Sequence, residues 1–312
     1  MAQHTVVKTQ RKTPPWAWLF VALGAHTAWG AYPVLARYLQ TVSRLPSMSL
    51  LTLGYLLVLP VLAVVVLPHM ERRFLRLRVL WLFAVIVVLR GITNLLAARF
   101  TLAIYVQLIT LMTPFVVALL SRALLRELIP PYTGRAITLS LMGALLMMSG
   151  KVGRAGVQLA LTPTDGMGIA LAFISTFFLA LYMVIVRRTV LDDVPGQAVL
   201  FVQVVTLLGM SALLSFLLGE DWSRWRAIGP TDWLIFGAYC LGVLLGANTS
   251  QIKALRHLGA PLVSSLLPWR LVSALFVAAL LLDERLTSHW QVVGALMVLV
   301  TITWYLWQQR VE

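Results

Sequence analysis

The 312-residue chain has little charge and almost no cysteine. Only 12% of its residues are charged and 60% are hydrophobic, whereas about a quarter of a soluble domain is charged. Its single cysteine, Cys240, excludes an internal disulfide and a cysteine-based metal site, and we expect it to pack within a span. Only 11 residues are acidic, and all lie in predicted loops, at predicted span edges or at the C-terminus. The middle of every long apolar run therefore lacks a carboxylate.

These absences exclude several functions. An exporter of lipophilic cations, or a carrier with an Asp or Glu proton relay, would need a carboxylate at depth in the membrane. The sequence has no Gly-x-Ser-x-Gly elbow, no His-Glu-x-x-His pair and no phosphate-binding loop. We therefore expect no enzymatic activity, no cofactor and no bound metal.

Long apolar runs dominate what is present, and runs of 18 or more such residues indicate membrane-spanning helices. The lipid bilayer is thus the first expected partner, and the fold class is an all-α integral membrane protein. The ten predicted transmembrane helices cover residues 16–39, 48–68, 79–99, 102–122, 132–150, 166–188, 196–218, 232–254, 260–282 and 290–309.

The net charge of +14 could suggest nucleic acid, but the basic residues lie in short loops between apolar runs and form no recognition motif. With the N-terminus inside, the cytoplasmic segments hold 15 Lys and Arg residues and the outer loops hold seven. This bias predicts a multi-pass protein of the inner (plasma) membrane with both termini cytoplasmic, and no nucleic-acid partner.

Matched polar residues indicate an internal repeat. Pairs offset by 154 residues are Asn94 with Asn248, Arg99 with Lys253, and Pro114 with Pro268; pairs offset by 150 are Tyr32 with Tyr182 and Arg37 with Arg187. Each unit holds an odd number of helices, five, so the second must be inverted relative to the first. Inverted repeats are typical of secondary transporters, with the substrate site between them. The expected divisions are a cytoplasmic tail, a first repeat, a linker loop and a second repeat, at 1–15, 16–150, 151–165 and 166–309.

Two five-helix halves, a proline within each fourth helix and an acidic tag after it resemble the drug/metabolite transporter (DMT) superfamily of the EamA type. The tags here read Arg126-Glu127 and Asp283-Glu284-Arg285 instead of the usual Gly-Glu. The resemblance implies two EamA-like repeats that move metabolites such as amino acids by alternating access. It also implies a pathway between the halves, lined by helices 1, 3, 4, 6, 8 and 9.

Two arginines lie in the middle of predicted spans, Arg90 in the third and Arg270 in the ninth. A buried arginine costs at least about 2.5–3.5 kcal/mol on insertion scales. Since no acid lies at this depth, water, backbone carbonyls or an anionic ligand must offset each charge. We predict that both guanidiniums bind a substrate carboxylate or phosphate. The alternative is that one or both stabilise broken helices.

Other polar and aromatic residues within the spans are candidates to line the same site, although each could equally pack or join helices. Asn94 lies one turn from Arg90, and Asn248 and Gln251 share a face of the eighth helix. His26 is the one core side chain expected to titrate near neutral pH, which makes proton coupling possible. The remaining substrate-site candidates are Tyr32, Tyr182, Ser175, Gln107 and Trp269.

The sequence therefore predicts a secondary transporter, working as an exporter, of a small metabolite bearing a carboxylate or phosphate, such as an amino acid or organic acid. One alternative is a carrier for a neutral or drug-like substrate in which the arginines are structural. A second is a membrane scaffold without transport. Substrate identity, coupling ion, direction and oligomeric state stay open.

Overall fold

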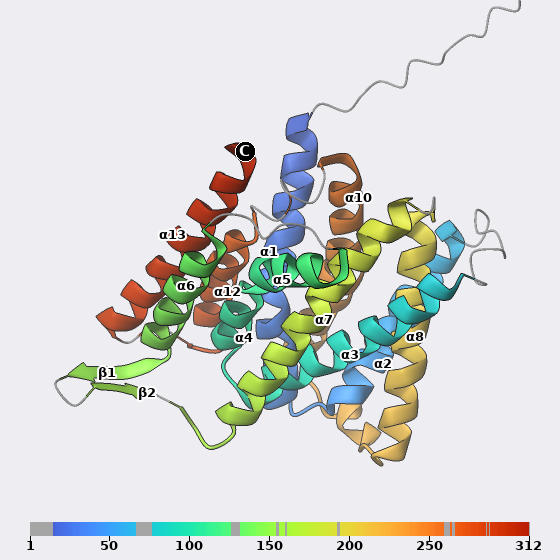
Figure 1. Ribbon diagram of the computed structural model, residues 1–312. Helices are drawn as coiled ribbons and strands as arrows, with labels where there is room; N and C mark the ends of the chain where they lie inside the picture. The colour runs from blue at the N-terminus through green and yellow to red at the C-terminus, as the bar shows by residue number, and fades with distance from the viewer. Residues whose placement is uncertain are drawn as a thin grey trace, which may run out of the picture.

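The computed structural model describes residues 15–66, 77–125, 132–153, 156–159, 161–191, 194–258, 263, 266–284, 286 and 288–311 (Figure 1). Almost all of these residues are helical. Within this part of the chain, eight helical segments are long and apolar enough to cross a bilayer, and two shorter apolar helices, Thr133–Met147 and Pro268–Leu281, accompany them. Together they confirm an all-helical membrane fold.

The helices fall into two inverted five-helix repeats. The first repeat consists of α1 (Pro15–Thr41), α2 (Ser47–Val66), α3 (Arg78–Phe100), α4 (Ala103–Thr110) with α5 (Thr113–Leu125), and α6 (Thr133–Met147). The second consists of α7 (Asp165–Leu191), α8 (Gly196–Leu217), α9 (Pro230–Gly237) with the π-helical η4 (Ala238–Ala247) and α10 (Asn248–Leu258), then α12 (Pro268–Leu281) and α13 (His289–Val311). A 3-10 turn, η3 (Trp222–Arg226), precedes α9.

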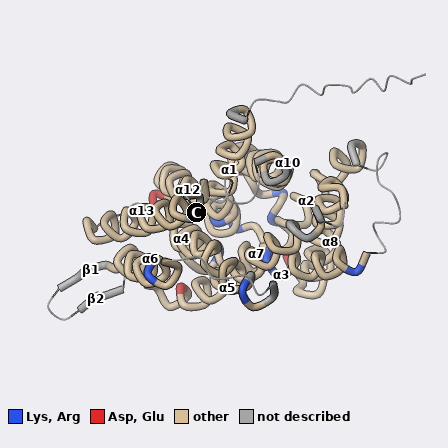
Figure 2. Tube along the Cα trace, turned by 45° about the horizontal axis from the view of Figure 1, so that its top comes forward, with Lys and Arg blue, Asp and Glu red and all other residues tan. Residues whose placement is uncertain are grey.

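Between the repeats lies a short antiparallel hairpin, β1 (Ser149–Gly153) and β2 (Gly156–Leu159), which begins two residues before the predicted linker loop of 151–165. It projects from the helices at one side of the molecule, whereas the start of α1 and the end of α13 lie together at the opposite end (Figure 1). Viewed as a tube, the described helices show few charged positions along their lengths (Figure 2). Among the described residues, the buried charged side chains are Arg90, Asp165 and Arg270.

The fourth span of each repeat is discontinuous, where the sequence predicted unbroken helices at 102–122 and 260–282. In the first repeat, α4 ends at Thr110 and α5 resumes at Thr113, just before Pro114. In the second, α12 begins at Pro268 itself, with proline at the first helical position. Proline lacks a backbone donor and suits this position, so both prolines start helices instead of kinking them. Broken helices at matching places in two repeats are typical of transporter binding sites.

The repeats interlock instead of standing side by side. Helix α1 packs against α12, α3 against α7, α2 against α8, and α6 against α13, so each of these pairs joins one half of the chain to the other. Helix α1 also contacts η4 and α10. The centre of the molecule is therefore bounded by helices from both repeats, and α1 runs through it.

The α6–α13 pair depends on glycine. A Cβ atom on Gly294 would lie 2.4 Å from the Met147 amide nitrogen and 2.5 Å from the Gly143 carbonyl oxygen. Both neighbours are backbone atoms, so a side chain can fit only if the helices separate.

We therefore expect Gly294→Ala to destabilise the protein by about 1–3 kcal/mol, the usual cost of overpacking. Thermal unfolding in detergent measures this as a lower Tm. Gly209→Ala is the matched control, because a Cβ atom there has no neighbour within 4 Å. An equal Tm for both variants would contradict the close approach.

Candidate substrate site

Both mid-membrane arginines converge on one indole ring at the centre of the molecule. The guanidinium carbon of Arg90, on α3, lies over the Trp29 ring of α1, 5.0 Å from the ring centroid. That of Arg270, on α12, lies 5.6 Å from the same centroid. Trp29 is 7% exposed, and its indole Nε1–H has no hydrogen-bond partner. Two cations and an unused donor thus meet where the two repeats join.

Arg90 is held mainly by aromatic rings. Besides Trp29, its guanidinium lies 4.7 Å from the ring centroid of Tyr182 on α7, and its backbone carbonyl accepts a hydrogen bond from the Ser175 hydroxyl at 3.2 Å. In the part of the chain that the structure describes, no carboxylate pairs with Arg90. Ring faces attract a cation by about 0.5–2 kcal/mol each, less than the several kcal/mol that burial of an ion costs. Arg90 therefore keeps capacity to bind an anion.

Arg270 is 2% exposed and is oriented by two neighbouring side chains. Its Nε donates to His26 Nδ1 at 2.8 Å, and its Nη2 donates to Gln251 Oε1 at 3.2 Å. The backbone comes unusually close here, because a Cβ atom on Gly30 would lie 2.4 Å from the Arg270 carbonyl oxygen. Gly30 thus allows α1 and α12 to touch beside the site. As for Arg90, no described carboxylate is its partner.

Tyrosines extend this aromatic wall. Tyr32 packs at 5.7 Å from Trp29 and stacks at 5.6 Å on Tyr239 of η4. Tyr182, the repeat partner of Tyr32 in the sequence, lies on the other side of Arg90. All three tyrosines are buried. The site is therefore a layer of aromatic faces that holds two guanidiniums.

The other predicted site residues are distributed around this layer. Asn248 accepts from Gln203 Nε2 at 3.0 Å and donates to the Leu244 carbonyl at 2.9 Å. Buried atoms without a hydrogen-bond partner include Asn94 Oδ1 on α3 and Gln107 Nε2 on α4. Trp269 lies apart, because its ring is 42% exposed and its Nε1 donates to Thr27 Oγ1 at 2.8 Å.

Sequence reasoning missed Trp29 and Tyr239. Tryptophans in membrane proteins usually lie at span ends, where they mark interfaces, but Trp29 lies in the middle of the predicted first span, three residues from His26. This spacing places both on one face of α1 and was a readable signal. Tyr239 had no such signal, because only the fold brings the wide π-helical turn of η4 against α1.

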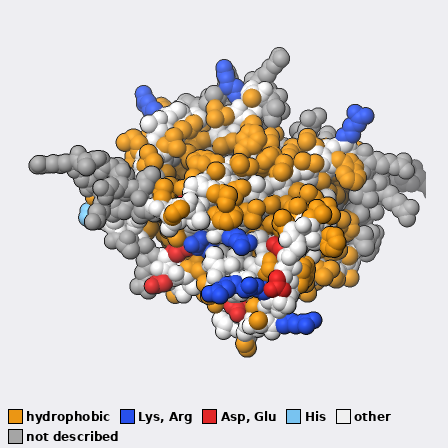
Figure 3. Space-filling view, turned by 90° about the horizontal axis from the view of Figure 1, so that it is seen from below, with side chains coloured by type: hydrophobic (Ala, Val, Ile, Leu, Met, Phe, Trp, Pro, Cys, Tyr) orange, Lys and Arg blue, Asp and Glu red, His pale blue; other side chains and the backbone are white. Residues whose placement is uncertain are grey.

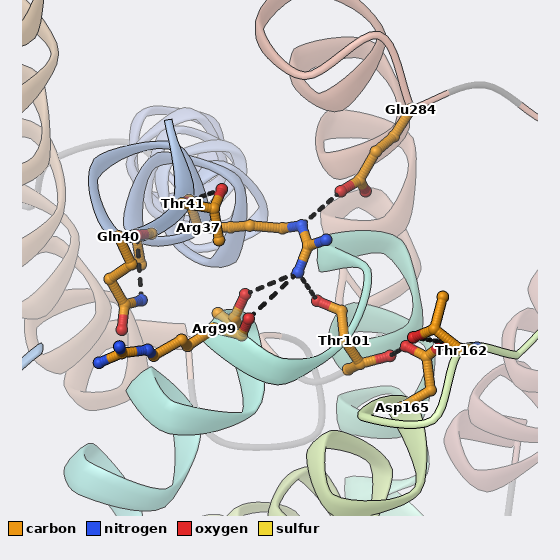
Figure 4. Close-up of polar contacts among 10 residues, drawn as sticks. Arg37, Gln40, Thr41, Arg99, Thr101, Thr162, Asp165 and Glu284 are labelled. Carbon is orange, nitrogen blue, oxygen red and sulfur yellow. Dashed lines mark hydrogen bonds and ion pairs between the residues drawn. The ribbon is translucent and has the colours of Figure 1, made fainter. Parts of the chain in front are cut away.

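Helix α1 runs from the end of the molecule where the chain ends lie toward the opposite face (Figure 1), and a second polar cluster lies near its C-terminal end (Figure 4). Arg37 Nε pairs with Glu284 Oε1 at 2.8 Å, with side chains 21% and 9% exposed. The Arg37 Nη1 donates to the carbonyls of Ala98, at 3.3 Å, and Thr101, both at the end of α3. Burial raises the pKa of Glu284 above its ordinary value, although the Arg37 charge opposes this. Arg37 thus ties α1, the α3–α4 turn and the loop after α12 together.

Neighbouring bonds extend this cluster. The Thr101 hydroxyl donates to Asp165 Oδ1 at the start of α7, and Thr162 Oγ1 donates to Asp165 Oδ2 at 2.7 Å. Gln40 Nε2 donates to the Leu95 carbonyl at 3.1 Å. On this face, acidic and basic side chains gather in a band among mainly hydrophobic ones (Figure 3). Unlike the two central arginines, Arg37 thus has a described carboxylate as its partner.

The two inverted helical repeats with a polar site between them define a membrane transporter of small molecules. Residues 16–149 and 166–307 both match the EamA-like transporter family. The chain therefore belongs to the EamA-like transporter family, as the sequence motifs indicated.

Other comparisons add only to the fold. One solved crystal structure superposes with a TM-score of 0.63 at 17% sequence identity, covering 95% of this chain and 99% of the other. No curated protein matches the chain significantly. The similarity supports the ten-span architecture and says nothing about the substrate.

Proposed function

We propose that the protein is a secondary carrier, working by alternating access, for a small metabolite that bears a carboxylate or phosphate. The observation that supports this is the pair of buried guanidiniums over Trp29, for which no described carboxylate supplies a counter-charge. An anionic substrate would neutralise them and would accept from the free Trp29 Nε1–H. Amino acids and organic acids are the simplest such molecules, and export across the inner membrane is the direction we favour.

The aromatic layer limits the shape of the ligand. Tyr32, Tyr182 and Trp29 offer flat faces beside the cations. A planar or partly apolar body attached to the acid group would therefore bury surface against the rings and gain further affinity. We expect such anions to bind more tightly than small, fully hydrated ones.

The test compares matched anionic and neutral compounds. Purified carrier is screened by thermal shift and by counterflow in proteoliposomes with benzoate against benzamide, glucose 6-phosphate against glucose, and a set of amino and organic acids. Ligands that bind the folded state raise Tm by mass action. We expect the anionic member of at least one pair to stabilise and exchange, and its neutral partner not to.

Two outcomes would redirect the proposal. Equal exchange of charged and neutral members would favour the neutral-substrate carrier, with Arg90 and Arg270 serving structure. Absence of counterflow for every compound that raises Tm would favour a scaffold that binds ligands but does not transport them.

A further inference from the structure

The hydrogen bonds of His26 fix its tautomer. Its Nε2 lies 3.0 Å from the Val263 carbonyl oxygen, which can only accept, so Nε2 carries a hydrogen. Its Nδ1 lies 2.8 Å from Arg270 Nε, which can only donate, so Nδ1 carries none. The imidazole in this arrangement is therefore neutral.

A second proton would change the arrangement. On Nδ1 it would place two N–H donors face to face and put an imidazolium directly against a guanidinium. The Arg270 Nε–H bond to His26 must then break. Protonated His26 and Arg270 in its present position exclude each other.

Among the described residues, no carboxylate pairs with His26 or Arg270 to absorb this charge. Arg270 on α12 touches His26 directly, and Arg90 on α3 lies across the Trp29 ring. On α10, the neutral side chain of Gln251 faces Arg270. His257, also on α10, stacks on Trp18, which lies eight residues before His26 in α1. From η4, the Tyr239 ring stacks on Tyr32 of α1, and Cys240 is buried beside it. From α7, the Tyr182 ring lies against Arg90. Thus Arg270 is the group that must respond.

We propose that His26 is a positioning residue for Arg270 and the site at which the carrier binds a proton. Proton uptake at Nδ1 releases the Arg270 guanidinium from α1, so that it can turn to a substrate anion. By linkage, an anion that draws Arg270 away from His26 favours protonation of the imidazole. Proton and anion therefore bind together, a conclusion that rests on the proposed anion transport.

The release can be tested without any substrate, by nitrogen-15 NMR of protein labelled at histidine and arginine in lipid nanodiscs. At alkaline pH we expect His26 as the Nε2–H tautomer and a slowly exchanging Arg270 Nε–H signal. On acidification, the Arg270 signal should disappear with the same midpoint at which His26 Nδ1 gains its proton. The spectra of His26→Gln and Arg270→Lys assign the two signals.

The His26→Gln variant also separates positioning from titration. A glutamine side chain can accept from Arg270 and donate to Val263 but cannot be protonated, so the Arg270 signal should persist at every pH. His257→Gln, which removes the histidine stacked on Trp18, should behave as wild type.

Three results would overturn the proposal: an Arg270 signal that persists while His26 titrates, its loss at the same midpoint in His26→Gln, or a His26 that stays neutral at the lowest pH tolerated by the fold. The wild-type titration decides alone if the glutamine variant does not fold. Failure here would leave the anion screen as an independent test of the transported class.

Discussion

Arg90→Gln is expected to abolish transport of an anionic substrate while leaving the fold intact. Loss of one partner of a buried charge pair costs about 2–5 kcal/mol, roughly 30-fold to several-thousand-fold in affinity. The substrate-free protein, however, gains from the change, because Arg90 is buried against ring faces and the Tyr182 hydroxyl, with no described carboxylate beside it. We therefore expect an unchanged or higher Tm.

Counterflow of the anion identified by the paired screen measures the first effect, and thermal unfolding without ligand measures the second. Arg224→Gln is the control, because its side chain is 50% exposed on η3 and its ion pair with Asp221 is a long 3.7 Å. A variant that exchanges the anion at the wild-type rate would assign Arg90 a structural role. A large fall in Tm of Arg90→Gln without ligand would also assign Arg90 a structural role.

The general architecture could be predicted from the sequence because a membrane imposes simple rules. Apolar runs of sufficient length must be helical, and the repeat could be detected from polar residues such as Asn94 and Asn248. The break before Pro268 was harder to place, since the apolar pattern continues smoothly from 260 to 282. Hydropathy reports burial, whereas a helix break depends on the local backbone.

The central site was only partly predictable for a related reason. Arg90 and Arg270 stood out because a charge at depth is expensive wherever it occurs. That they meet over Trp29 is a property of helix packing, which brings α3 and α12 to the same face of α1. Trp269 was a candidate for the site, but it points away from it. Adjacent helix residues point in different directions, so Trp269 is exposed while its neighbour Arg270 is buried.

Helix packing also gives Arg37 contacts that its position in the sequence does not indicate. In the sequence it is one more cation within a predicted first span. In the structure it pairs with Glu284 and donates to backbone carbonyls at the end of α3, so two repeats depend on one side chain. It lies eight residues beyond Trp29 on α1, about 12 Å along a helix. Arg37 thus lies between the central site and the C-terminal end of α1, at Thr41.

Under the proposed alternating access, opening of the face opposite the chain ends would break the Arg37 contacts, so their removal should favour the open state. A cysteine that reports access to the central site can be placed at Ser175, whose buried hydroxyl donates to the Arg90 carbonyl. The one native cysteine of the chain, Cys240, is replaced so that only the new cysteine reacts. In a Cys240→Ser, Ser175→Cys background, we expect Arg37→Gln to speed labelling by a membrane-impermeant thiol reagent added at that face by tenfold or more. Each charge-assisted hydrogen bond lost contributes about 1.5–3 kcal/mol.

A graded series of variants tests whether the faster labelling is specific to loss of the Arg37 contacts. Glu284→Gln removes only the ion pair and should speed labelling less than Arg37→Gln, while Arg37→Lys keeps the charge but loses the fork that reaches several acceptors at once. Arg224→Gln breaks an exposed ion pair near the same face and should leave the rate unchanged, as solvent-exposed pairs contribute little. If all four variants label at the parental rate, the barrier lies elsewhere. If Arg224→Gln accelerates labelling as much as Arg37→Gln, surface charge alone governs access, because the Arg224–Asp221 pair lies within one repeat whereas the Arg37 contacts join the two.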